Sequence, residues 1–303
     1  RIIRYYPTKE NTFMIIPAYA KLNLLLNVQS KYLNGYHSLE TIMAPLELCD
    51  YLHIDLIDNS NEIIIETNVN NIPTDEQNIL HKCICLFKLH YNISSGFNIY
   101  LEKNIPVRSG LGGESTDAAS MMNFLNQTFK LNMLYSEIFY YGRLLSWDVP
   151  ICYFQKYMYI NDKKSICEEI DCGQEYYILL IMPDYGISTS KAFDMLDINP
   201  YKNVEGNILL ESLLQNRKDI GSFIHNSFIE TNHVLKSDFY RLQSYCKSLR
   251  FDGISMTGTG SCFFMITHNY EILKNGYEVL YHQYPYVFST KTLSNLNINK
   301  SLL

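Results

Sequence analysis

The sequence contains no run of the roughly 20 apolar residues that a membrane-spanning helix needs. Its longest apolar stretches, such as residues 176–182, have the length of strands. It also has no block of Lys and Arg. The 25 basic and 31 acidic side chains together give the chain a net charge of −6. These absences argue against a membrane partner and a general nucleic-acid partner, while an anionic small molecule can still bind at a local site.

The eight cysteines contain no C-x-x-C pair, and Cys83 and Cys85 form a C-x-C without a second pair. Structural zinc sites need such ligand spacing. In a chain of 303 residues we therefore predict reduced, buried thiols of a reducing compartment rather than a metal centre.

The chain begins at Arg1 without an initiator Met, and residues 1–12 are polar and lack an apolar signal core. They are therefore not an intact secretory signal. We interpret them as the cut end of a longer precursor.

The length of 303 residues, with 47% hydrophobic side chains, is sufficient for two domains with sizeable cores. We place the boundary near Gln174, which gives domains of residues 1–174 and 175–303. Alternation and turn residues predict strands over 21–28, 53–56, 62–66, 97–101, 176–182, 253–256, 262–267 and 287–292. Residues 58–61 are expected to close a hairpin, and Asn34-Gly35 a turn. Helical spacing predicts helices over 78–89, 115–129, 219–228, 238–249 and 270–281, so the class is α+β.

A glycine-rich loop lies between the strand at 97–101 and the helix at 115–129. Glycines let an anion approach backbone N–H groups, and a helix start adds unpaired donors. Ser115 or Thr116 is expected to cap the helix, with Asp117 in its first turn. The loop is neither a Walker A motif nor a complete G-x-G-x-x-G, so an ordinary turn is the alternative to a phosphate site.

This loop and three other segments together resemble the GHMP kinases, which include galactokinase, homoserine kinase and mevalonate kinase. Residues 106–119 are similar to the family's phosphate loop, Pro-x-x-x-Gly-Leu-Gly-Gly-x-Ser-x-Asp-Ala-Ala. Residues 20–24 resemble its Ala-Lys-x-Asn-Leu, residues 148–150 its Asp-Val-Pro, and residues 257–261 its C-terminal glycine-rich motif. The four motifs occur in the family's order, which makes the combination specific although each one alone is not.

Residues 34–41 resemble the Asp-Gly-Tyr-His-x-Leu-x-Thr stretch of one branch of this family. That branch phosphorylates the 2-hydroxyl of a cytidine diphosphate-linked methylerythritol in the non-mevalonate route to isoprenoid precursors. The resemblance implies an N-terminal domain like domain 2 of ribosomal protein S5 and a ferredoxin-like C-terminal domain. We expect a monomer or weak homodimer, in a plastid stroma if the start is processed or otherwise in a bacterial cytoplasm.

The resemblance also implies the catalytic and acceptor-binding residues. Asp148 corresponds to the general base, and Lys21 beside it keeps this carboxylate ionised and orients the acceptor. Asn23 completes the acceptor site. The residues implied for the cytidine end and for a substrate-side loop are Tyr36, His37 and Thr189.

The donor implied by the family is ATP with Mg²⁺. The residues assigned to ATP are Asn78, Lys103, Pro106, Gly110, Leu111, Gly112, Gly113, Ser115 and Thr116. Of these, Asn78 and Lys103 match positions near the adenine, and Ser115 is also the candidate ligand of Mg²⁺.

Three residues depart from the branch pattern. Arg108 and Glu114 stand where glycine is usual, and Ser146-Trp147 replaces Gly-Ala before Asp148. Two alternatives therefore stay open: another GHMP kinase of the homoserine or mevalonate type, or a catalytically silent nucleotide-binding protein. Retention of both Lys21 and Asp148 argues against the silent protein, because binding alone needs neither.

Overall fold

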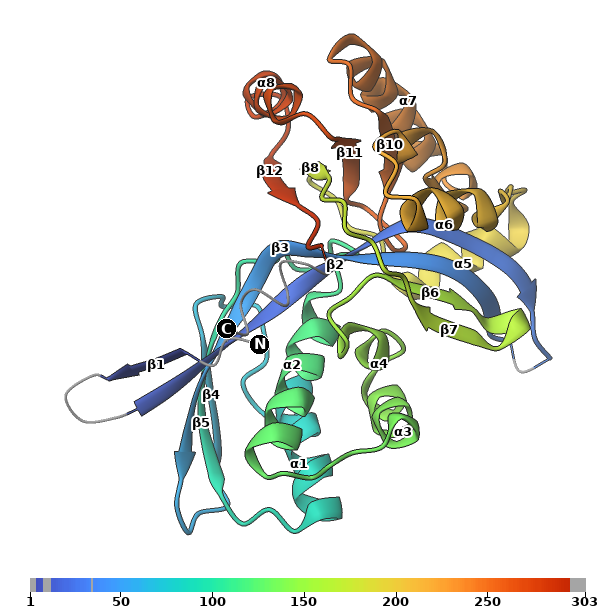
Figure 1. Cartoon of the computed structure of the whole chain (residues 1–303). Helices are drawn as coiled ribbons and strands as arrows, with labels where there is room; N and C mark the ends of the chain where they lie inside the picture. Colours follow the sequence, from blue (N-terminus) through green and yellow to red (C-terminus); the bar gives the residue numbers. More distant parts are fainter. Residues whose placement is uncertain (1–3, 8–11, 34, 295–303) are drawn as a thin grey trace.

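The computed structural model describes residues 4–7, 12–33 and 35–294. Asn34 of the expected turn, and residues 1–3 and 8–11 of the polar start, lie outside these described residues. Two long strands, β2 (Thr12–Lys31) and β3 (His37–Ile57), form an antiparallel ribbon through the middle of the molecule (Figure 1). The ribbon connects the lower, N-terminal part of the molecule to the upper, C-terminal part.

The register of the ribbon shifts at three places, between Tyr19 and Lys21, between Asn23 and Leu25, and between Val28 and Ser30. Such irregularities bend a strand and re-aim its side chains. The short segment that carries Lys21 and Asn23 is therefore enclosed by two of them. Between these two polar residues, Leu22 is fully buried in the core that also contains Phe264.

The N-terminal sheet has the strand order β1-β2-β3-β5-β4, and the β6–β7 hairpin and the short β9 pair with the far part of the ribbon. The strands other than the ribbon are β1 (Arg4–Pro7), β4 (Ile63–Thr67), β5 (Gly96–Glu102), β6 (Met158–Asn161), β7 (Ile166–Glu169) and β9 (His225–Asn226). The predicted hairpin of residues 53–66 is wrong, since β5 lies between β3 and β4 and pairs with both. Turn residues show where the chain reverses direction, but they do not show that a later strand, here β5, is inserted between the two strands that the turn connects.

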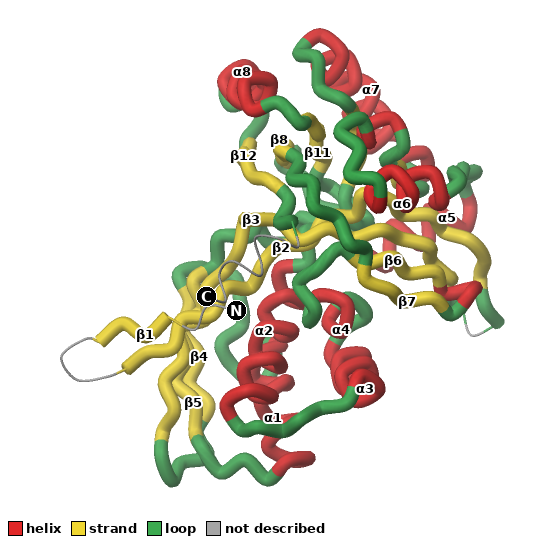
Figure 2. Tube along the Cα trace, viewed as in Figure 1, coloured by secondary structure: helices red, strands yellow, loops and turns green. Residues whose placement is uncertain are grey.

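Four helices cover one face of this sheet, as Figures 1 and 2 show. They are α1 (Ile79–Tyr91), α2 (Gly113–Thr128), α3 (Tyr135–Leu145) and α4 (Val149–Cys152). Helix α1 buries Leu80, Ile84 and Phe87, and α2 buries Met121 and its neighbours in the same core. The apolar spacing of both helices was sufficient to predict them.

A second sheet, of order β10-β11-β8-β12, is entirely antiparallel and forms the upper part of the molecule (Figure 1). Its strands are β8 (Tyr177–Met182), β10 (Gly253–Met256), β11 (Phe263–Thr267) and β12 (Tyr286–Lys291), and its helices are α5 (Thr189–Ile198), α6 (Gly206–Leu214), α7 (His233–Ser248) and α8 (Tyr270–Leu280). The fold is thus α+β. The domain boundary at 174 stays a prediction, and the first strand of this sheet begins at Tyr177.

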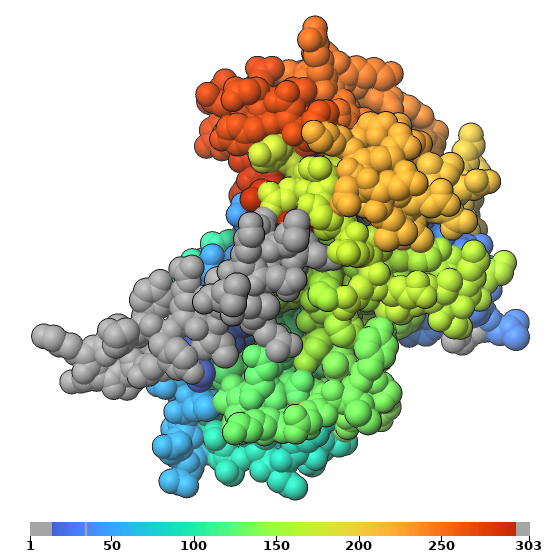
Figure 3. Space-filling view, viewed as in Figure 1, coloured from blue at the N-terminus to red at the C-terminus, as the bar shows by residue number. Residues whose placement is uncertain are grey.

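The helix predicted over 219–228 is wrong. That segment contains a 3₁₀ turn at Ile220–Ser222 and then β9, whose His225 pairs with Leu25 of the ribbon. In the space-filling view, the blue-to-green lower body and the yellow-to-red upper body are packed together (Figure 3). Pairing of β9 with the ribbon contributes to this contact, which local spacing does not reveal.

All eight cysteines are free thiols, and Cys49, Cys83, Cys172, Cys246 and Cys262 are buried. The prediction of buried thiols is wrong for Cys85, which is exposed on α1. Among the described helices, none has both the length and the apolar character needed to cross a membrane.

Candidate active site

The loop between β5 and α2 is shaped by two glycines with left-handed backbone conformations. Gly110 has a φ of +80°, and a Cβ on it would lie 2.4 Å from the carbonyl oxygen of Thr257. Gly112 has a φ of +75°, and a Cβ there would lie 2.7 Å from Lys21 Cγ. Glycine is therefore required at both positions, because it alone avoids the clash and the strained φ.

Helix α2 begins at Gly113, and Gly112 occupies the N-cap position without a side-chain cap. The expected cap by Ser115 or Thr116 is therefore wrong. The Thr116 hydroxyl bonds to the carbonyl of Gly113 (3.0 Å), and the Ser115 hydroxyl lies 3.2 Å from Ser146 Oγ. The absence of a capping side chain fits a helix start whose N–H groups serve an anion.

Lys21, Asn23 and Asp148 come together beside this loop. The Lys21 ammonium lies 3.3 Å from Asp148 Oδ2 and donates a hydrogen bond of 2.7 Å to Asn23 Oδ1. The Lys21 side chain is 9% exposed, whereas that of Asp148 is 29% exposed. The cation is thus held by the protein, and the carboxylate beside it can be reached from outside.

Asn23 connects the ribbon to the C-terminal glycine-rich loop. Its Oδ1 accepts a hydrogen bond from the backbone N–H of Gly258 (3.0 Å), and its Nδ2 donates to Thr41 Oγ1 (2.9 Å). The hydroxyl of Thr257 lies 3.2 Å from the carbonyl of Gly110. The backbone N–H of Lys21 donates to the carbonyl of Leu111 (2.9 Å). All four sequence motifs therefore meet at one place.

The three departures lie around the rim of this place. Arg108 is exposed with a φ of +58°, a conformation in which glycine is unstrained. Glu114 is exposed in the first turn of α2. The guanidinium carbon of Arg143 lies 3.2 Å from the centroid of the Trp147 ring, so the indole directly before Asp148 is stacked and not directed into the core.

The two residues assigned to positions near the adenine, Lys103 and Asn78, both have hydrogen-bond partners within the protein. The Lys103 ammonium is buried and bonds to Asp50 and, at 2.7 Å, to Asp117 Oδ2. Burial raises the pKa of Asp117 well above the ordinary range, although the charge of Lys103 opposes this shift. Asn78 caps α1, where its Oδ1 accepts from the N–H of Leu80 (2.8 Å). Their contact with a nucleotide stays a prediction, as does that of Pro106 in the loop.

The residues assigned to the cytidine lie at the far end of the ribbon. His37 Nε2 is 2.7 Å from Asp197 Oδ1 of α5, and its ring stacks on Phe193 with centroids 5.0 Å apart. Tyr36 is 72% exposed beside it. Thr189, at the start of α5, has its hydroxyl 3.5 Å from that of Thr259 in the C-terminal glycine-rich loop.

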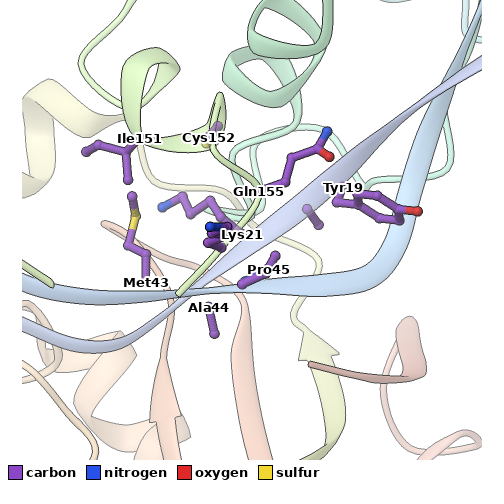
Figure 4. Close-up of a pocket in the computed structure, with 10 residues that line it drawn as sticks. Tyr19, Lys21, Met43, Ala44, Pro45, Ile151, Cys152 and Gln155 are labelled. Atoms are coloured by element: carbon purple, nitrogen blue, oxygen red, sulfur yellow. The ribbon is translucent and has the colours of Figure 1, made fainter. Parts of the chain in front are cut away.

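A small pocket lies beside the Lys21 side chain, between the ribbon and α4 (Figure 4). Met43, Pro45, Ile151 and Cys152 line it. Burial raises the pKa of the Cys152 thiol. The lining is mostly apolar, and its charged side chains are Lys21 and Lys156.

The sequence alone did not assign Thr41, Arg143, Phe193 and Asp197. Thr41 lies inside a recognised motif, and its contact with Asn23 follows from strand pairing. Phe193 and Asp197 follow Thr189 by four and eight residues, which places them on one face of a helix that local spacing did not predict.

Residues 78–156 match the GHMP kinases N terminal domain. The chain is 31% identical to the 4-diphosphocytidyl-2-C-methyl-D-erythritol kinase of Clostridium tetani, over 92% of this chain and 100% of that protein. It is 33% identical to the enzyme of the same name from Caldicellulosiruptor bescii, over 86% and 92%. A crystal structure of 4-(cytidine 5'-diphospho)-2C-methyl-D-erythritol kinase superposes with a TM-score of 0.76 at 21% identity, covering 92% of this chain and 99% of that one.

The chain belongs to the GHMP kinase family and is a small-molecule kinase. Within that family, the proteins to which it is similar at this level over most of its length are the 4-diphosphocytidyl-2-C-methyl-D-erythritol kinases of the non-mevalonate route to isoprenoids. The family resemblance inferred from the four motifs is confirmed.

Proposed function

We propose that this protein transfers the γ-phosphoryl group of ATP to the 2-hydroxyl of 4-diphosphocytidyl-2-C-methyl-D-erythritol. The observation that carries the proposal is the 3.3 Å approach of Lys21 to Asp148, directly beside the phosphate loop. A kinase of this type works by positioning and by neutralising charge, and the protein supplies little covalent chemistry.

In this proposal Asp148 accepts the proton of the acceptor hydroxyl as the oxygen attacks phosphorus. The neighbouring ammonium of Lys21 stabilises negative charge on the transferring group. Asn23, fixed by Gly258 and Thr41, holds Lys21 in place. The α2 start and the backbone of Gly110–Gly113 would bind the phosphates of ATP, with Pro106, Leu111, Ser115 and Thr116 completing the loop.

The first turn of α2 offers donors that suit Mg²⁺. Ser115 supplies a hydroxyl and the exposed Glu114 a carboxylate, and oxygen atoms of these types are the ligands that Mg²⁺ prefers. When bound, the ion neutralises phosphate charge. We therefore assign Glu114, a departure from the branch pattern, together with Ser115 to this ion.

We propose the two-domain description of the family for this chain. The order β10-β11-β8-β12, with α7 between β8 and β10 and α8 between β11 and β12, supports a ferredoxin-like C-terminal domain. The S5-like name for the N-terminal domain, the monomer or weak homodimer, and the plastid or bacterial compartment stay predictions. The relatives compared above are bacterial proteins.

The test measures ADP release from ATP and Mg²⁺ with the cytidyl acceptor, for the native protein and for Asp148→Asn. We expect turnover that requires the acceptor and falls by about 10²–10⁴ in the variant, the usual contribution of a positioned base. Asp58→Asn, which changes an exposed aspartate in the turn after β3, is the matched control and should retain native activity.

The alternatives give different results in the same assay. Turnover with homoserine or mevalonate, and none with the cytidyl acceptor, would establish another GHMP kinase. A folded native protein that binds ATP without turning over any of the three acceptors would be a silent nucleotide-binding protein. Inhibition by CMP in competition with the acceptor supports the cytidyl substrate.

A further inference from the structure

The cytidine end of the ribbon carries an ion cluster that the four motifs do not account for. Asp197 of α5 bonds to two residues of the ribbon at once, with Lys31 on one carboxylate oxygen and His37 Nε2 at 2.7 Å on the other. Lys31 and His37 face each other across the ribbon as a register pair. The His37 side chain is only 6% exposed, and Phe193 covers one face of its ring.

These contacts determine which ring nitrogen of His37 carries hydrogen. The hydrogen bonds from Lys31 and His37 lower the pKa of Asp197, so this carboxylate is ionised at neutral pH and can only accept hydrogen bonds. His37 Nε2 must therefore be the donor. In the neutral ring, Nδ1 then has a lone pair and acts as an acceptor.

The two pyrimidine bases differ in what they present to such an acceptor. Cytosine carries an amino group at position 4, which donates, whereas a base of the uracil type carries a carbonyl oxygen there, which accepts. An acceptor nitrogen on His37 can accept a hydrogen bond from the amino group of cytosine, but it repels the carbonyl oxygen of a uracil-type base.

We propose that Asp197 is a positioning residue that, held by Lys31, fixes the tautomer of His37 and thereby makes the acceptor site select cytosine over uracil. The proposal rests on the proposed function, since it concerns the base of that acceptor. It assigns a role in specificity to a side chain that does not itself touch the substrate.

The test compares the cytidyl acceptor with its uridyl counterpart at pH 8, above the ordinary range of histidine. Asn at position 197 can either donate to or accept from the imidazole, so Asp197→Asn releases the tautomer. We expect KM for the cytidyl acceptor to rise about tenfold with kcat nearly unchanged, and the cytidyl-to-uridyl ratio of kcat/KM to fall at least tenfold. A purely structural role would weaken both acceptors alike and leave this ratio unchanged, which would overturn the proposal.

Asp219→Asn is the matched control, because Asp219 also forms an exposed ion pair, with Arg217, but lies away from the ribbon end. It should leave the ratio unchanged. If the folded native protein turns over neither acceptor, the proposed function fails. The tautomer is then still tested by ring ¹⁵N NMR, with the His37 signals assigned by comparison with His37→Gln. Hydrogen on Nε2 in the native protein and a mixture in Asp197→Asn support the proposal, and hydrogen on Nδ1 in the native protein contradicts it.

Discussion

Gly112 and Lys21 pack so closely that the glycine cannot carry a side chain: its Cβ would lie 2.7 Å from Lys21 Cγ and 3.0 Å from Lys21 Cε. The backbone of the phosphate loop thus supports the side chain that faces Asp148. The loop and the proposed base are linked through the aliphatic part of one lysine.

Gly112→Ala should therefore reduce activity more than it reduces stability. A non-glycine residue in the left-handed region costs about 1–2 kcal/mol, and displacement of Lys21 by even about 1 Å can cost 10² in rate. We expect kcat/KM to fall about 100-fold in steady-state assays, with a cooperative thermal transition retained. Gly186→Ala is the control, because its Cβ meets only Arg108 at ordinary distances of 3.8 Å and longer. Equal activity of Gly112→Ala and the native protein would show that Lys21 adapts freely.

The buried group of Lys103, Asp50 and Asp117 predicts opposite effects of two similar substitutions. Asp50 accepts hydrogen bonds from the backbone N–H groups of Asn104 (2.6 Å) and Ile105 (2.7 Å) in addition to Lys103. Asp117 Oδ1 has no hydrogen-bond partner among the described residues. Asp50→Asn should therefore cost about 3–5 kcal/mol of unfolding free energy, as expected when a buried charge loses its partner.

Asp117→Asn should instead increase the free energy of unfolding, relative to that of the native protein, as the pH rises. Burial raises the pKa of Asp117 in the folded state, so folding takes up a proton above the ordinary carboxyl pKa of about 3.9. The native protein loses this stability as the pH rises through the raised pKa, whereas the asparagine variant does not. Urea unfolding at pH 5 and pH 8 should show a relative gain of at least about 1 kcal/mol for the variant. If the difference in unfolding free energy between the two proteins does not change with pH, Asp117 is already ionised in the folded protein at pH 5.

Trp147 is the single tryptophan of the chain, and it precedes Asp148. Because the Arg143 guanidinium stacks on its ring, Arg143→Ala should expose the indole and shift its emission maximum to longer wavelength. Binding of ADP with Mg²⁺ should change the emission saturably, since Ser146 contacts Ser115 of the phosphate loop. Arg241→Ala, which removes the cation near Tyr284, should leave the emission unchanged. Identical spectra for Arg143→Ala and the native protein would contradict the stacked geometry.

The parts of the site that the sequence predicted are those encoded in continuous motifs. Lys21, Asn23, Asp148 and the glycines are each recognisable within a few residues, and the structure brings them together. Asp197 was not predictable in this way, because its significance depends on His37, which is 160 residues away in the chain.

The difference between local patterns and contacts of distant segments also explains the errors in the predicted fold. The helices over 78–89 and 270–281 were predicted because their periodicity is local. The insertion of β5 between β3 and β4, and the pairing of β9 with β2, depend on contacts between distant segments. A helix start set by the backbone of Gly112 likewise lacks the side-chain signal that pointed to Ser115.

The ribbon of β2 and β3 also sets a length. Met43 is opposite Asn23 and His37 is opposite Lys31, and the six residue steps from His37 to Met43 correspond to about 20 Å at about 3.3 Å per residue. One pair of strands thus carries both the proposed reacting end, at Lys21 and Asn23, and the proposed base-recognising end, at His37. A nucleoside, two phosphates and a four-carbon polyol joined end to end are long enough to contact both places on the ribbon. A free amino acid or a short hydroxy acid is long enough to contact only one of them. We therefore predict that the ribbon selects its acceptor by length as well as by chemistry.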